Sequence, residues 1–140
     1  MTEKNIPDLQ AALVCEDVRQ EMNPASQTLV GVVNCLQSPQ FPVTAFKLFV
    51  WVRWCAGRGQ FTQRVRLLTT DEVTVLRESD CTFQLADENV SVTNITLFGG
   101  VQFEKPGVYW VEVHLDNVLK IHFPFPVLQI KPPPAPAVND

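Results

Sequence analysis

The chain has 140 residues, 46% hydrophobic and 19% charged, so it is long enough for one domain with its own core and too apolar for a disordered protein. Its formal net charge of -4 gives no global positive field, which argues against nucleic acid as a partner. The apolar runs are too short to span a membrane, and the polar N-terminus lacks the apolar core of a signal peptide. We therefore expect a cytoplasmic protein.

Four cysteines, at positions 15, 35, 55 and 81, form no C-x-x-C pair and have no histidine at zinc-binding spacing. We interpret them as reduced, mostly buried thiols. The sequence predicts no metal site and no cofactor.

The N-terminal third is predicted to alternate strands with loops. Residues 1–8 form a flexible lead, residues 9–15 a buried first strand or, since the alanines favour it, the start of a helix, and the charged residues 16–21 a solvated loop. Glu16, Asp17 and Glu21 could hold a cation, but the glycine and the ligand spacing of a calcium loop are missing. Residues 28–36 form a second strand, in which Gly31 marks a bulge or a close backbone approach.

Residues 44–55 alternate almost completely and predict a long strand. One face is apolar and is assigned to the core: Phe46, Leu48, Val50, Val52 and Trp54. The other face is amphipathic and places two aromatic residues between two cations: Lys47, Phe49, Trp51 and Arg53. Residues 60–68 alternate as in a sheet with one solvated face.

Further short strands are predicted at residues 73–76, 81–85, 90–98 and 101–103, and residues 131–140 form a disordered, proline-rich tail. No segment has a sustained helical period, and turn signals recur about every ten residues. The sequence therefore predicts an all-β, antiparallel two-sheet sandwich of about seven to nine strands over residues 9–130.

Residues 106–125 predict a hairpin that turns at Asp116-Asn117. A connection one residue longer than a two-residue turn leaves one face apolar, whereas the tight turn mixes polar and apolar residues on both faces. We therefore predict the longer connection, with Asn117 at positive φ. It pairs Leu115 with Leu119, Val113 with Ile121, Val111 with Phe123, His114 with Lys120, and Glu112 with His122.

The segment from Gly107 to Val111 resembles the G-x-Y-x-C pattern of immunoglobulin-like sandwiches, with Val111 in place of the cysteine. The resemblance implies that the Tyr109 hydroxyl bonds to the backbone just upstream and that the sandwich is immunoglobulin-like.

Residues 15–21, 29–32 and 106–113 together resemble a family of small bacterial proteins defined only as a domain of unknown function. The resemblance spans nearly the whole chain apart from the proline tail. It implies a bacterial, cytosolic β-sandwich and supplies no catalytic residues.

Two groups of residues are candidate sites. Phe49, Trp51, Trp110 and Arg53 could form an aromatic, basic surface for a protein partner, or fill a second layer or a dimer interface. The other group, Glu112, His114 and His122, shares the polar face of the hairpin; it is either an outward cross-strand cluster or a general-base site.

These patterns favour a non-enzymatic protein-binding or assembly module that acts through a protein partner or through self-association. The alternative is a sandwich that binds a small molecule or carbohydrate in a pocket lined by Trp51, Trp54 or Trp110. An enzyme built on Glu112, His114 and His122 has the least support, because no nucleophile motif accompanies the histidines.

Overall fold

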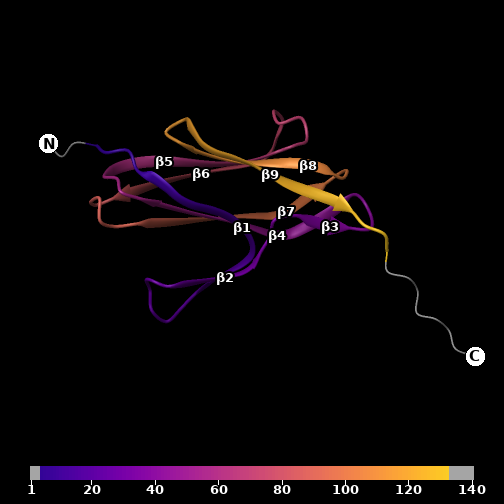
Figure 1. The fold of residues 1–140 in the computed structure, drawn as a ribbon, viewed down its shortest axis with the longest axis horizontal. Helices are drawn as coiled ribbons and strands as arrows, with labels where there is room; N and C mark the ends of the chain where they lie inside the picture. The colour runs from indigo at the N-terminus through magenta and orange to yellow at the C-terminus, as the bar shows by residue number, and fades with distance from the viewer. Residues whose placement is uncertain (1–3, 133–140) are drawn as a thin grey trace, which may run out of the picture.

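In a computed structural model, which describes residues 4–132, the chain forms nine strands in two sheets and no helix within those residues (Figure 1). The predicted two-sheet β-sandwich is confirmed; its closer likeness to immunoglobulin domains stays a prediction. The strands are β1 (Asp8–Gln20), β2 (Gln27–Val32), β3 (Leu36–Ser38), β4 (Val43–Cys55), β5 (Gly59–Leu68), β6 (Val75–Leu85), β7 (Val92–Phe103), β8 (Gly107–Leu115) and β9 (Val118–Gln129). The predicted tail from residue 133 onward lies outside the described residues.

One sheet has the strand order β2-β1-β4-β7, and the other has the order β3-β9-β8-β5-β6. All pairs are antiparallel except β3 with β9, which run parallel over three residue pairs. In Figure 1 the two sheets lie one above the other, and the β1–β2 hairpin leaves the lower layer. Lys4 and Asn5, in the predicted flexible lead, contact Asp116 and Arg58 respectively.

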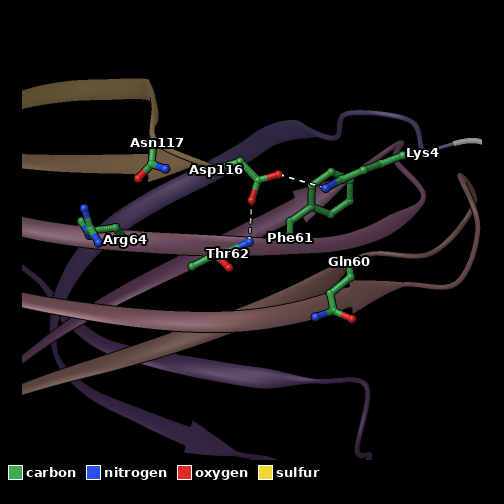
Figure 2. Close-up of a pocket in the computed structure, with 7 residues that line it drawn as sticks. All are labelled: Lys4, Gln60, Phe61, Thr62, Arg64, Asp116 and Asn117. Atoms are coloured by element: carbon green, nitrogen blue, oxygen red, sulfur yellow. Dashed lines mark hydrogen bonds and ion pairs between the residues drawn. The ribbon is translucent and has the colours of Figure 1, made fainter.

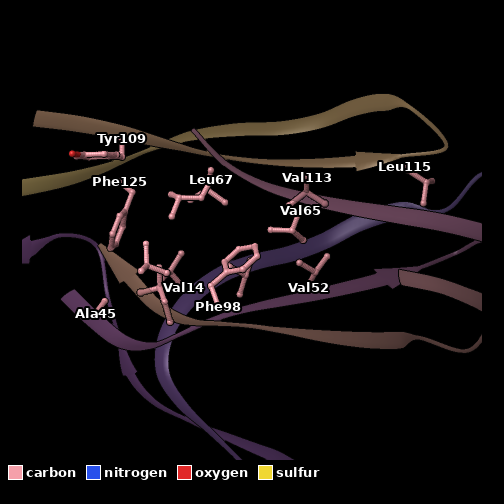
Figure 3. Close-up of a cluster of buried hydrophobic side chains, with 14 of the residues drawn as sticks. Val14, Ala45, Val52, Val65, Leu67, Phe98, Tyr109, Val113, Leu115 and Phe125 are labelled. Carbon is pink, nitrogen blue, oxygen red and sulfur yellow. The ribbon is translucent and has the colours of Figure 1, made fainter. Parts of the chain in front are cut away.

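The core lies between the two sheets and consists of the inward residues of each alternating strand (Figure 3). Val14, Val52 and Phe98 come from the first sheet, and Val65 and Val113 face them from the second. Burial of each such side chain contributes about 1.5–3 kcal/mol relative to its exposure. The alternation in β4, β5 and β8 thus determines which face of each sheet points inward.

The first hairpin differs from its prediction. Residues 16–20, predicted as a solvated loop, continue β1 and pair with β2, because both strands of this hairpin tolerate polar side chains on exposed faces. The predicted strand 28–36 is divided into β2 and β3. Gly31 has a φ of 62°, and a Cβ there would lie 2.6 Å from Glu16 Oε2, a side-chain atom. The β1–β2 register is regular at this point, so the glycine provides a positive φ rather than the predicted bulge or close backbone approach.

The prediction for Phe46 is wrong, since this side chain is 82% exposed. Ala45 and Leu48 are both buried, so two residues rather than one separate the inward positions at this point of β4. The paired segment of β7 is Gly99-Gly100, where Gly100 has a φ of 61°. The irregularity therefore affects both strands, and alternation as predicted resumes at Leu48.

Strand β6 runs unbroken through residues 77–80, where the sequence suggested a break, and β7 likewise joins two predicted strands. The polar residues Glu78 and Asp80 face outward and pair with Arg66 and Arg64 of β5 at 2.8 Å. Because cross-strand ion pairs stabilise charged side chains on a solvent-exposed face, a polar segment such as residues 77–80 can form part of a strand.

The β8–β9 hairpin has the register of the two-residue turn next to the turn and the register of the longer connection further along the strands. A two-residue turn places Asp116 and Asn117 at φ values of 46° and 67°, so Leu115 pairs with Val118 and the predicted Leu115–Leu119 and His114–Lys120 pairs are wrong. A bulge then shifts the register, and the pairs Val113–Ile121, Glu112–His122 and Val111–Phe123 form as predicted. The extra residue is absorbed in the strand instead of the turn, because Asp-Asn suits two successive positive φ angles.

The predicted hydrogen bond of Tyr109 is present: its hydroxyl donates to the Lys105 carbonyl oxygen at 2.7 Å. The ring packs edge-on against Phe103, with 4.8 Å between centroids. This contact fixes the chain where it enters β8 from the β7–β8 connection.

Candidate functional site

The outer face of the four-stranded sheet carries the alternating residues of β4 that the sequence assigned to the amphipathic face. Leu48, Val50 and Val52 point into the core, so Lys47, Phe49, Trp51 and Arg53 point outward. In the two neighbouring strands the positions level with these residues are mostly apolar: Ala11, Leu13 and Cys15 in β1, and Thr93, Ile95 and Leu97 in β7. We call this set the outer face.

The outer face contains two apolar rows that run across the strands. In the first row, Trp51 lies between Leu13 of β1 and Ile95 of β7; in the second, Phe49 lies between Cys15 and Leu97. Leu13, Ile95 and Leu97 are 36%, 42% and 51% exposed. The β7 end of both rows is therefore open to solvent.

The β1–β2 hairpin folds back over part of this face. Gln27 lies beside the hairpin turn and accepts a hydrogen bond from Trp51 Nε1 at 2.8 Å. In the view of Figure 1, β2, the edge strand of this sheet, lies below β1 and β4. Trp51 is only 8% exposed and Cys15 is fully buried, yet neither belongs to the core between the sheets. The hairpin thus forms a second, smaller buried layer outside the sandwich.

Burial also affects the thiol in this layer. Burial, with the nearby Asp17 carboxylate, raises the pKa of Cys15 above its ordinary value and keeps it a neutral thiol. All four cysteines are unpaired; the other three are half-buried.

Arg53 lies at one end of the outer face and has two contacts that set its orientation. Its Nε donates to Thr93 Oγ1 at 2.9 Å, and its guanidinium carbon lies 4.6 Å from the centroid of the Trp51 ring. Both contacts are with neutral groups.

Trp110 does not lie on the outer face. It projects from β8 on the five-stranded sheet and stacks on His122, with 4.4 Å between ring centroids and 15° between planes. The predicted partner-binding group is therefore divided: Phe49, Trp51 and Arg53 share one sheet, and Trp110 is on the other.

The predicted polar cluster does come together, on the outer side of the five-stranded sheet. Glu112 Oε1 lies 3.2 Å from His114 Nε2, and Glu112 Oε2 lies 3.0 Å from His122 Nδ1. The sequence did not predict a fourth member, Glu72, whose Oε1 lies 3.2 Å from His122 Nε2. Glu72 has a φ of 63° in the β5–β6 loop, and no local signal pointed to its contact with β9.

Charge and burial act in opposite directions within this cluster. Burial disfavours the charged form of Glu112, but hydrogen bonds with His114 and His122 outweigh it, so the pKa of Glu112 is lowered. Burial likewise disfavours protonated His122, but Glu112 and Glu72 outweigh it, so the pKa of His122 is raised. Both His122 nitrogens are engaged by carboxylates of the chain itself. No group of metal-ligating geometry occurs among residues 4–132.

A pocket of about 520 Å³ lies beside the β8–β9 turn (Figure 2). Lys4 Nζ contacts Asp116 Oδ2 at 3.1 Å, and Asp116 Oδ1 accepts a hydrogen bond from the Thr62 amide at 2.9 Å. The Thr62 amide and Lys4 hold the pKa of Asp116 below its usual value. Arg64, also in the lining, is paired with Asp80. Each of these charges is satisfied inside the protein, so the pocket presents no free charge to a ligand.

The chain belongs to the family of unknown function DUF6941, whose model matches residues 10–128. This confirms the predicted membership of a family without known function. No curated protein matches the chain. Within residues 4–132 there is no helix with the length and apolar character needed to cross a bilayer.

Proposed function

We propose that this protein is a non-enzymatic protein-binding or assembly module and that it binds its partner through the outer face. The main observation behind the proposal is that Ile95 and Leu97 are 42% and 51% exposed and lie in the same apolar rows as Trp51 and Phe49. Contiguous exposed apolar residues beside a half-buried aromatic residue, here Phe49, are characteristic of interfaces.

The charges of the outer face define the chemistry of the partner. Lys47 and Arg53 are the only charged residues in the set that defines the outer face, and they flank the apolar rows. They are six residues apart along β4, or about 20 Å at the rise of a strand. A partner segment with acidic residues on either side of an apolar centre complements this face.

Two acidic residues of the nearby hairpin are paired within it, whereas a third, Glu16, lines a pocket together with Lys47. Asp17 lies 3.7 Å from Arg19, and Glu21 accepts a hydrogen bond from Thr28, so both are engaged within the hairpin. The locally cationic face contrasts with the net charge of -4 of the whole chain. This contrast favours an acidic partner of a different sequence. In a dimer formed through the outer face, the cations of one copy would face those of the other.

The non-enzymatic part of the proposal is supported by the polar cluster. A general base needs a nitrogen within reach of a substrate proton, and both nitrogens of His122 are held by Glu112 and Glu72. Trp110 also covers one face of the imidazole. The cluster is better suited to fastening the β5–β6 loop to the sheet than to catalysis.

We further propose a bacterial cytosolic setting. The four unpaired cysteines support it, since a reducing compartment keeps such thiols free.

Selection of peptides from a random display library against the whole protein tests the proposed function. We expect enriched peptides to carry apolar residues flanked by Asp or Glu, and to lose at least tenfold in affinity for Leu97→Asp. The matched control is Val108→Asp, a position 42% exposed on the other sheet, which should bind them as the parent does. Failure to enrich any peptide, or equal loss in both variants, contradicts the proposal.

A further inference from the structure

A second pocket, of about 440 Å³, lies where the tip of the β1–β2 hairpin meets the ends of β4 and β7. It is lined by Pro24, Ala25, Gln27, Arg53, Ser91 and Thr93. The hairpin tip and the sheet are far apart in sequence, and the hydrogen bond from Trp51 to Gln27 holds them together at the pocket wall. No carboxylate lines this pocket.

Arg53 is the charged residue of the pocket, and the contacts that orient its guanidinium do not include a carboxylate. Thr93 holds Nε and the Trp51 ring supports the guanidinium plane, while neither Nη atom bonds to any residue between 4 and 132. Arg64 and Arg66 on the other sheet differ, since Asp80 and Glu78 accept from them at 2.8 Å. The Arg53 guanidinium therefore has a fixed orientation and two Nη groups available as donors. Within the part of the chain that the structure describes, no neighbouring side chain neutralises its charge.

We propose that this pocket is a carboxylate-binding site in which Arg53 is the principal ligand. A carboxylate matches two parallel N–H donors of a guanidinium in one plane. The hydroxyl groups of Ser91 and Thr93 line the same pocket and supply further donors.

The carboxylate can belong to a free dicarboxylic acid or to an acidic side chain of a bound protein segment. In the second case the site is continuous with the outer face and anchors one end of the partner. The site uses Trp51 but not the exposed residues Ile95 and Leu97 of the apolar rows, so it can hold a carboxylate whether or not the proposed function is correct.

Titration of the ¹⁵N-labelled full chain by NMR tests the proposal, with succinate and an Asp-containing peptide as separate ligands. We expect saturable shifts of the Arg53 Nε–H and Trp51 Nε1–H signals, and no such shifts with sodium chloride of equal ionic strength. Tighter binding of succinate identifies a free acid as the ligand, and tighter binding of the peptide identifies a partner's side chain. Equal affinity for inorganic phosphate and succinate contradicts a carboxylate site.

Three variants complete the test. Arg53→Lys keeps the charge but loses the paired donors, so succinate affinity should fall about tenfold. Thr93→Val keeps Arg53 but removes the acceptor of its Nε, so binding should also weaken. The control is Arg77→Lys: Arg77 also lies over an aromatic ring and donates to a neutral oxygen, but it is outside this pocket. Unchanged binding in Arg53→Lys, with a preserved amide spectrum, overturns the proposal. Leu97→Asp should retain succinate binding, which separates this site from the proposed function.

Discussion

The Trp51 indole nitrogen donates a hydrogen bond to Gln27 Oε1 at 2.8 Å, and this bond joins the four-stranded sheet to the hairpin that covers it. The contact explains why an aromatic residue on the outward side of β4 is only 8% exposed. It also forms one wall of the pocket that contains Arg53. The position of the hairpin therefore controls both the extent of the outer face and the shape of the pocket.

Replacement of Gln27 by Ala should loosen the hairpin. Loss of one partly buried hydrogen bond costs about 1 kcal/mol, and the Trp51 N–H then needs water as its partner. Hydrogen exchange should become faster in residues 16–32, while the core strands change little. Gln10→Ala, at an exposed position of β1, is the control. Unchanged exchange in the hairpin of Gln27→Ala would show that this bond does not hold it.

Gln63 should be essential to stability because it accepts two hydrogen bonds in the core. Trp54 Nε1 and Asn94 Nδ2 donate to its Oε1 at 2.8 and 3.1 Å, while Gln63 Nε2 has no partner within the described residues. Gln63→Met removes the acceptor and should cost about 2 kcal/mol in urea unfolding. Addition of Asn94→Leu should recover part of the loss, because one orphaned donor is then removed. A Gln63→Met protein as stable as the parent would refute this role.

The stability of the protein should depend on pH through His122. The pKa of His122 is raised above 6.5 by folding, so its contribution is fully present below pH 6.5 and is lost as pH rises through the higher folded value. The pKa of Glu112 is lowered, so its contribution is present above about pH 4.5 and is lost as pH falls through the folded value. The two together predict greatest stability between pH 4.5 and 6.5.

Thermal unfolding across this range measures the effect. His122→Gln should abolish the decline above pH 6.5, and Glu72→Gln should make it smaller, because Glu112 remains as a partner. A decline of the same size in His122→Gln would assign it to another group.

Tyr109→Phe should destabilise the protein by about 1 kcal/mol, the typical net value of one hydrogen bond. The hydroxyl that bonds to the Lys105 carbonyl is lost, whereas the edge-on packing against Phe103 is kept. Urea unfolding should give a lower midpoint with an unchanged slope. No change in midpoint would mean that water replaces the bond at no cost.

The features that the sequence predicted well depend on local alternation. The two faces of β4 from Leu48 onward, the pairing of Glu112 with His122, and the bond of Tyr109 all follow from period-two patterning or a short motif. Phe46 was misplaced because paired irregularities in β4 and β7 leave no signal in β4 alone.

The remaining features depend on contacts between distant segments. Nothing near Trp51 in sequence indicates that Gln27 will cover it, and nothing near Trp110 indicates that it lies on the other sheet. The contact of Glu72 with His122 joins residues 50 apart in sequence. Such relationships are set by which strands share a sheet, and that information is not local.

Hydrogen exchange of the protein with and without a display-selected peptide tests most directly whether the outer face is the binding surface. We expect the bound peptide to slow exchange in residues 47–53 of β4 and 93–97 of β7, and to leave exchange in β5, β6, β8 and β9 unchanged. Protection confined to the five-stranded sheet, around Trp110 and His122, would contradict it.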